Sequence, residues 1–381
     1  MPPPPPPPTP TPVPTPARTP TPAPGPRGAG ARLVPVLRHP VAVGVLAVVL
    51  AGLAGLGLVM GAGTQPAVAW DALVEGMFGS PYAIGSSLNS AAVLALIATG
   101  FTVAHRAGLV NVGGEGQLCA GGLAAAAVGG TLPAGVPAAL AVPLVLAAGC
   151  LAGGAWAGIA AWLRTKRGTS EVITTLLLNF IGVGLVSVAV HEEALLRQPV
   201  TSSETLPQSA PLPEGARLPL IGGIESPATA IVVIAAVAAV LTGVVLRHTS
   251  VGLRLRSVGH SPAASARLGL PVARLEGGSL AFAGAAAGLA GASLVAIAPY
   301  VLAEHFSSGY GFSGLVVGLL ARGSLTAVAA VSLLFGFLTN GGINLQLAAE
   351  VPASSVQIVQ SLLVLFVAAA MFTTTRDRSG S

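Results

Sequence analysis

Polar residues that could interact with a solute are concentrated in one short stretch, residues 106–117, between two strongly apolar runs. The stretch reads RAGLVNVGGEGQ and contains Asn111, Glu115 and Gln117. Irregular polar backbone at membrane depth is stable only where protein covers it or water reaches it. These residues are therefore predicted to line a path through a membrane, with Glu115 accepting hydrogen bonds near the inner mouth. The alternative is a plain turn between two membrane spans at the cytoplasmic surface.

A second set of polar groups lies in the apolar run 171–190, where Thr175 and Ser187 share the helix with the expected path residues Thr174 and Asn179. Asn179 is the ninth residue of this run, about 12 Å from its start at 1.5 Å of rise per residue. All four side chains are neutral, and an ion without an opposite charge is very costly to desolvate. They therefore predict a path for a small neutral solute with hydroxyl or amide groups. Alternatively, Asn179 only bonds to a neighbouring helix, a common use of Asn in membranes.

Other sequence patterns argue against catalysis in this chain. A GxxxxGK[ST] phosphate loop is absent, and no two histidines have the spacing of metal ligands. Cys119 and Cys150 fall in apolar runs and are interpreted as small packing residues. The net charge of +5 is small and is interpreted as an orientation signal rather than as a surface for nucleic acid. The chain is therefore predicted to be no enzyme and to hold no metal or cofactor.

The composition predicts which elements must position these residues. Of 381 residues, 53% are hydrophobic and only 8% are charged, whereas soluble domains carry about 25% charged residues. The fold class is therefore an all-α, polytopic transmembrane bundle. A span needs about 20 residues, and about ten spans are predicted, the third and the eighth of them short. They lie near 41–61, 86–104, 116–131, 137–162, 171–190, 228–247, 277–298, 312–322, 324–340 and 355–374.

The basic residues predict the orientation of this bundle. If the N-terminus is inside the cell, only Arg197 and Arg217 of the 18 basic residues lie in outer segments. Lys and Arg accumulate in cytoplasmic loops, so both termini are predicted to be cytoplasmic. Residues 1–40 are expected to form a disordered Pro/Thr-rich tail, 41–374 the transmembrane domain, and 375–381 a second cytoplasmic tail. The acidic loop 191–227 then lies outside, as a docking surface for a solute-binding partner or as a passive connector.

The long cytoplasmic loop 248–276 contains a predicted helix. Ser261 and Pro262 can begin it as cap and first residue, and Gly269 can end it. A short helix between two spans on this side is suited to bind a cytoplasmic partner. The alternative is a basic loop that only sets the orientation.

Several blocks, read together, resemble the permease subunits of ABC importers for nucleosides and simple sugars. They are RAGLxNxGxEGQ at 106–117, EVITT with LNFI at 171–181, VGHSPAASARLGL at 258–270, GLAGA at 288–292 and GYGFSG at 309–314. The third block departs from the family pattern at Ser261, where Asn is usual, and at Arg267, where Tyr is common. The first block favours the nucleoside-type branch over the ribose-type branch.

The resemblance implies a function and a set of partners. The chain would be the permease of a nucleoside importer in the bacterial inner membrane, or alternatively of an importer for a simple sugar such as ribose or galactose. Its partners would be a cytoplasmic ATPase that uses the ATP, a second permease subunit of the same or a related sequence, and an extracytoplasmic solute-binding lipoprotein. A stand-alone secondary transporter or channel is the rival, but the predicted spans have no Asp, Glu, Lys or Arg at their centres. The expected ATPase-coupling residues are Gly252, Arg254, Gly259, Ser261, Pro262 and Gly269.

Overall fold

The computed structural model of the protein describes residues 63–133, 135–200, 206–223 and 225–349, together with a few single residues. Several predictions lie outside these ranges: the tails 1–40 and 375–381, most of the predicted span 41–61, and the span 355–374. These remain predictions.

The described residues form an all-helical structure, as the sequence predicts, and contain no β-strand beyond isolated bridges in the loops. In chain order the elements are α2 (Pro66–Phe78), α3 (Pro81–Arg106), α4 (Gly114–Thr131), α5 (Ala138–Arg167), α6 (Glu171–His191), the short 3-10 helix η2 (Glu214–Ala216), α7 (Ile231–His248), α8 (Ser250–His260), α9 (Pro262–Arg267), α10 (Val272–Ala296), α11 (Tyr310–Ala321) and α12 (Leu325–Ala349).

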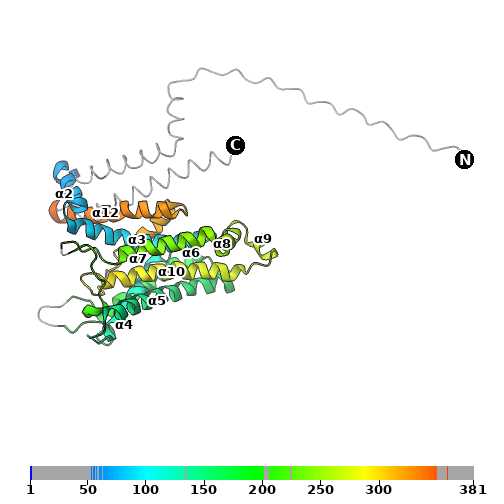
Figure 1. Cartoon of the computed structure of the whole chain (residues 1–381), viewed down its shortest axis with the longest axis horizontal. Helices are drawn as coiled ribbons and strands as arrows, with labels where there is room; N and C mark the ends of the chain where they lie inside the picture. Colours follow the sequence, from blue (N-terminus) through cyan, green and yellow to red (C-terminus); the bar gives the residue numbers. More distant parts are fainter. Residues whose placement is uncertain are drawn as a thin grey trace, which may run out of the picture.

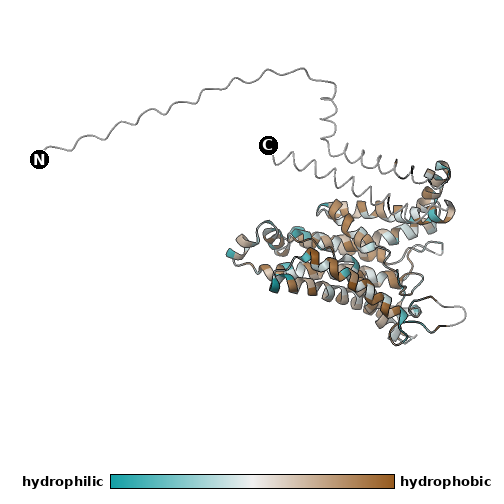
Figure 2. Ribbon diagram, turned by 180° about the vertical axis from the view of Figure 1, so that it is seen from behind, coloured by the Kyte–Doolittle hydropathy of each residue, from teal (hydrophilic) through white to brown (hydrophobic). Residues whose placement is uncertain are grey.

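Six of the described helices are long and apolar enough to cross a membrane, namely α3, α5, α6, α7, α10 and α12. Apolar residues run along the length of the bundle, while the hydrophilic ones gather toward its ends (Figure 2). The total of ten spans and the orientation remain predictions.

Helices α3 and α10 form the centre of the bundle. In α3, 83% of the most apolar 18-residue stretch is buried inside the protein, and in α10 the share is 67%. The corresponding share in α5, α6, α7 and α12 is only 22% to 33%. Helix α10 packs against α3, α4 and α5, and α3 also contacts α7, α11 and α12. Figure 1 shows α8 and α9 together at one end of this bundle. We call it the α8–α9 end.

Glycine brings the central helices into backbone contact. A side chain at Gly288 of α10 would overlap the carbonyl oxygen of Gly149 on α5, and one at Gly291 would overlap that of Leu118 on α4. Small residues allow such close approach between membrane helices. The seam leaves no room for larger residues, so α4, α5 and α10 form a rigid support for the elements around them.

Two parts of the described chain differ from full-length spans: the non-helical residues 107–113 between α3 and α4, and helix α11. Helix α3 ends at Arg106, and residues 107–113 are non-helical before α4 begins at Gly114. Helix α11 has only 12 residues, about 18 Å of rise. The last residues of both α3 and α11 lie at the α8–α9 end, where the Arg106 Nη2 donates to the Gly323 carbonyl at 2.7 Å. Helix α11 therefore begins about halfway across a hydrocarbon core of about 30 Å.

Some predicted boundaries were wrong. The predicted helices 116–131 and 312–322 begin two residues earlier, and 324–340 continues to Ala349. Helices α2 and α8 were not predicted at all. Both contain charged side chains, such as Asp71 and Arg254, so a search for apolar spans passes over them.

Candidate functional site

The seven residues 107–113, which we call the re-entrant segment, lead from α3 to the start of α4. Asn111 and Gln117 hold the bend through reciprocal hydrogen bonds, each 2.9 Å, from the amide nitrogen of one to the oxygen of the other. The Asn111 oxygen also accepts from the Gly113 N–H at 3.1 Å. Both side chains are buried. Their amides thus stabilise irregular backbone, which requires partners for its polar groups at membrane depth.

Asn179 joins α6 to this bend. Its oxygen accepts from the Gly116 N–H at 2.8 Å, and its nitrogen donates to the Val112 carbonyl at 2.9 Å. The close approach is possible because Gly116 has no side chain: a Cβ there would lie 2.6 Å from the Leu178 oxygen. The interhelical role that the sequence left open for Asn179 is therefore present, and Asn179 also lines a cavity described below.

Glu115 is buried in the first turn of α4 and faces the beginning of α11. Its Oε2 accepts from the Gly311 N–H at 2.8 Å, and Gly311 is the second residue of α11. A carboxylate at a helix N-terminus is stabilised by the free N–H groups and the helix dipole. The contact with the start of α11 places Glu115 near mid-depth of the bundle. Its place near the inner mouth of a path remains a prediction.

Thr175, rather than the predicted Thr174, belongs to this cluster. The Thr175 hydroxyl accepts from the Val112 N–H at 3.3 Å, whereas the Thr174 hydroxyl bonds to the Ser170 carbonyl of its own helix. Adjacent residues point about 100° apart around a helix with 3.6 residues per turn. Thr175 shares its face with Asn179 four residues later, so this i, i+4 spacing could have identified it.

A cavity of about 550 Å³ opens beside this cluster, between α6, α11 and the loop that precedes α11. Its wall includes Glu115 and Asn179 from the predicted set, together with Phe180 and Phe312, residues that are 69% and 41% exposed. Glu304 closes one edge, where it accepts from the Ser187 hydroxyl of α6 at 2.8 Å. Asn111, Gln117 and Thr174 do not line the cavity.

Sequence reasoning missed Phe180, Phe312, Glu304 and the serines at 307 and 308 as cavity residues. Phe180 follows Asn179 directly, and Phe312 lies in the GYGFSG block, so both were adjacent to features that had been noted. No sequence pattern pointed to Glu304, because its contact with α6 depends on the path of the loop between α10 and α11.

The predicted helix in the 248–276 loop is present as α9. Ser261 caps it by accepting from the Ala264 N–H at 3.3 Å, and Pro262 is its first residue. Gly269 follows the helix with a φ of +77°, the left-handed conformation that glycine adopts readily. Helix α8 precedes α9, and its Arg254 is exposed.

Helix α8 contacts the re-entrant segment directly. A side chain at Gly259 would overlap the Arg106 carbonyl oxygen and would lie 3.0 Å from the Gly108 nitrogen. At the other end of α8, buried Gly252 approaches the Leu246 carbonyl equally closely. Helix α8 is thus fixed to α7 at one end and to the start of the re-entrant segment at the other.

An ion-pair cluster joins the nearby ends of three helices. Arg164 of α5 pairs with Glu171 of α6 and, at 3.3 Å, with Glu276 of α10. Glu171 also accepts from the Val110 N–H of the re-entrant segment at 3.4 Å. The segment therefore has bonded contacts with α6 at its middle, through Val110, and near its end, through Val112.

A comparison with known protein families identifies this arrangement. Residues 83–368 match the family described as "Branched-chain amino acid transport system / permease component". The chain belongs to this family. It is a multi-pass membrane protein that acts as a transport permease, which confirms the class predicted from the blocks. Family members work in ABC transport, with ATPase and binding-protein partners.

Several curated relatives cover most of the chain. A glucose ABC transporter permease protein of Haloferax volcanii is 33% identical, over 85% of this chain and 86% of the relative. A guanosine ABC transporter permease protein of Bacillus subtilis is 30% identical, over 85% and 91%. A nucleoside ABC transporter permease protein of Lactococcus lactis subsp. cremoris is 28% identical, over 86% and 90%. No solved structure matches the chain significantly.

Proposed function

We propose that this permease belongs to an ABC importer for nucleosides, and that the cavity beside Glu115 and Asn179 is part of the solute path. The observation that supports this most directly is the pairing of two exposed aromatic rings, Phe180 and Phe312, with hydrogen-bonding groups in one cavity. A nucleoside combines a flat base with a hydroxylated sugar, and base–aromatic stacking contributes about 1–3 kcal/mol per base.

The charges in the cavity also favour a neutral solute. Glu115 already accepts from the N-terminus of α11, and Glu304 accepts from Ser187. No lysine or arginine lines the cavity in the described part of the chain, and the one basic side chain there, His305, lies 3.9 Å from the Glu304 carboxylate. A carboxylate or phosphate would therefore lose hydration and gain no lysine or arginine as an opposite charge. Although the family description names branched-chain amino acids, a zwitterion fits this lining less well than a nucleoside does.

A simple sugar is the second candidate. Its support is specific, because the glucose permease of Haloferax volcanii is slightly more similar to this chain than the guanosine permease is. A hexose would use the hydroxyl and carboxylate groups of the cavity and only one aromatic ring. The two candidates therefore differ in how strongly uptake depends on both Phe180 and Phe312.

The α8–α9 end is the proposed cytoplasmic end, and α8 with α9 is the proposed docking site for an ATPase. Arg254 and Arg267 are exposed there, and Lys and Arg accumulate on the cytoplasmic side of membrane proteins. The opposite end carries the loop between α6 and α7, whose acidic residues would face a solute-binding lipoprotein. A second permease subunit, of the same or a related sequence, would complete the translocation path in the bacterial inner membrane.

Uptake competition tests the proposed substrate. In cells that express the complete importer, unlabelled guanosine, adenosine or uridine should compete with a labelled nucleoside, whereas glucose, ribose and leucine should not. Phe312→Leu and Phe180→Leu should each lower nucleoside uptake about tenfold, since stacking contributes about 1–3 kcal/mol. The matched control is Phe78→Leu on α2, far along the chain from the cavity, which should leave uptake unchanged. Competition by glucose or ribose alone would assign the protein to sugars instead, and competition by leucine would contradict the neutral path.

A further inference from the structure

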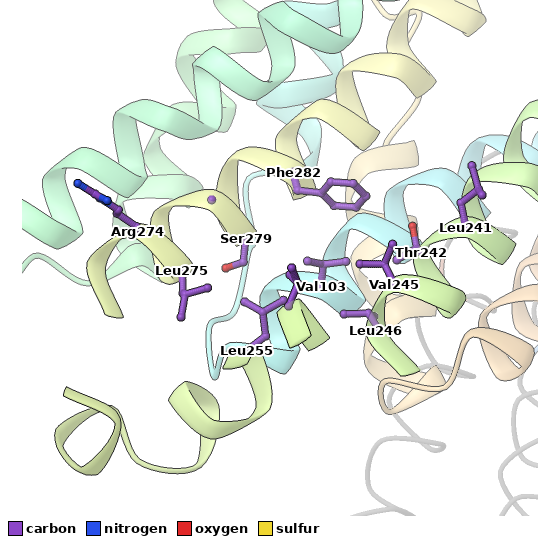
Figure 3. Close-up of a pocket in the computed structure, with 12 residues that line it drawn as sticks. Val103, Leu241, Thr242, Val245, Leu246, Leu255, Arg274, Leu275, Ser279 and Phe282 are labelled. Carbon is purple, nitrogen blue, oxygen red and sulfur yellow. The ribbon is translucent and has the colours of Figure 1, made fainter. Parts of the chain in front are cut away.

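A second cavity, of about 320 Å³, lies near the α8–α9 end, between α3, α7, α8 and α10. Its floor is buried and apolar and includes Val103, Leu246 and Leu255. Figure 3 shows side chains of α7 facing Phe282 of α10 across this space. The cavity is separate from the one beside Glu115 and shares no lining residue with it.

The cavity opens onto the part of the surface that a bilayer would cover. Leu241 and Val245 of α7 are 59% and 41% exposed, and Phe282 of α10 is 43% exposed, yet all three line the cavity. Helix α7 is among the least buried of the candidate spans, because only 22% of its most apolar 18-residue stretch is buried inside the protein. A hydrocarbon chain can therefore enter from the side and contact the apolar residues of the lining.

One hydroxyl in this apolar cavity has no partner. Thr242 is 93% buried and lines the cavity, and no residue that the structure describes forms a hydrogen bond with its side chain. Threonines in helices can bond to a carbonyl of their own helix, but Thr242 does not, and its hydroxyl is not among the fully buried atoms. The hydroxyl is therefore available to donate to a ligand that carries a hydrogen-bond acceptor into the cavity.

The segment from the end of α7 to Leu275 carries charges of a single sign, and the acidic residue that follows, Glu276, is paired with Arg164. From 247 to 275, all charged or titratable side chains are basic: Arg247, His248, Arg254, Arg256, His260, Arg267 and Arg274. None of them forms an ion pair with a described residue. Arg274 lines the cavity at the beginning of α10, and its side chain extends away from the apolar wall (Figure 3).

We propose that this cavity binds an anionic phospholipid, a role that goes beyond the proposed solute transport. One acyl chain lies between α7 and α10, an ester carbonyl accepts from Thr242, and the phosphate interacts with Arg274 at the membrane surface. Basic pockets between membrane helices on the cytoplasmic side bind anionic headgroups in this way. Because α8 forms one wall, the lipid also supports the element that contacts the re-entrant segment.

Native mass spectrometry of the purified full-length chain tests this proposal without measuring transport. The delipidated protein is mixed with equal amounts of phosphatidylglycerol and phosphatidylethanolamine that carry the same acyl chains. The wild-type protein should retain phosphatidylglycerol about fivefold more often, the effect of about one basic residue near an anionic lipid.

Two pairs of variants separate the charge from the cavity. Arg274→Gln should remove the preference for phosphatidylglycerol, whereas Lys166→Gln, at the end of α5 and outside the cavity, should keep it. Gly278→Leu should lower retention of both lipids, because Gly278 lines the cavity and a Cβ there meets no atom within 4 Å. Gly158→Leu on α5 also has open space and should leave retention unchanged.

The outcomes differ clearly between a specific site and general contact with lipid. Equal retention of the two lipids by the wild-type protein would overturn the proposal. So would a preference that persists in both Arg274→Gln and Gly278→Leu. Because every reading is a bound mass, failure of the nucleoside assignment would not affect this result.

Discussion

The re-entrant segment meets two regions that are built in opposite ways. At mid-depth, the side chains of Asn111, Glu115 and Asn179 are buried, and each of them bonds to backbone. In α8, the contact with the rest of the bundle is made by glycine backbone and by buried apolar side chains such as Leu255, while Arg254 is exposed. The polar groups at mid-depth therefore hold the chain in an unusual shape, and those of α8 and α9 remain available to another protein.

This difference suggests how the two regions communicate. Only the seven residues 107–113 separate the end of α3 from the start of α4, and α8 contacts their beginning through Gly259. A displacement of α8 would move Gly108 directly and would reach Val112, which bonds to Asn179. We expect a substitution that disturbs the mid-depth contacts to affect folding. We expect a substitution that disturbs α8 to affect the coupling of the ATPase to transport.

The largest effect is expected for Gly311→Val. A Cβ at this position would overlap the backbone of Glu115, and backbone on both sides leaves no flexible side chain that could yield. Overpacking costs about 1–3 kcal/mol even where side chains can adjust, so we expect little folded protein. Size-exclusion chromatography with fluorescence detection measures this, with Gly184→Val, which has open space on α6, as the control. A normal yield of Gly311→Val would contradict the tight contact between α4 and α11.

A smaller effect on folding but a large effect on transport is expected for Gly259→Ala. The added methyl group must push α8 away from the Arg106 carbonyl, while the mid-depth hydrogen bonds are untouched. Uptake by the complete importer should fall at least tenfold at a normal protein yield. Ser257→Ala is the matched control on α8, since its hydroxyl bonds only within its own helix. If Gly259→Ala transports normally, α8 does not act through the re-entrant segment.

The two regions also differ in how far the sequence predicted them. Ser261, Pro262 and Gly269 act within a few residues of themselves, so capping rules were sufficient to predict α9. Asn111, Glu115 and Asn179 could be predicted as buried polar groups that need partners. The free-energy cost of placing a polar side chain near membrane depth follows from the apolar sequence around it. Their partners could not be predicted: the bond from Gly311 to Glu115 spans 196 residues. Such contacts depend on the register of packed helices, which the glycine seam sets and which local patterns do not encode.

The smallest effect separates two adjacent threonines of α6 and tests the role of the mid-depth polar groups most finely. Thr175→Val keeps the shape of the side chain but removes the acceptor for the Val112 N–H, whereas Thr174→Val removes only a bond to the Ser170 carbonyl of the same helix. A buried donor without a partner costs about 1–3 kcal/mol, and the 3.3 Å distance of the Val112 bond favours the lower value. Thermal unfolding in detergent should therefore show a lower midpoint for Thr175→Val and almost none of that change for Thr174→Val. Equal midpoints would mean that the Val112 N–H finds another partner, and that Asn179 alone holds the re-entrant segment against α6.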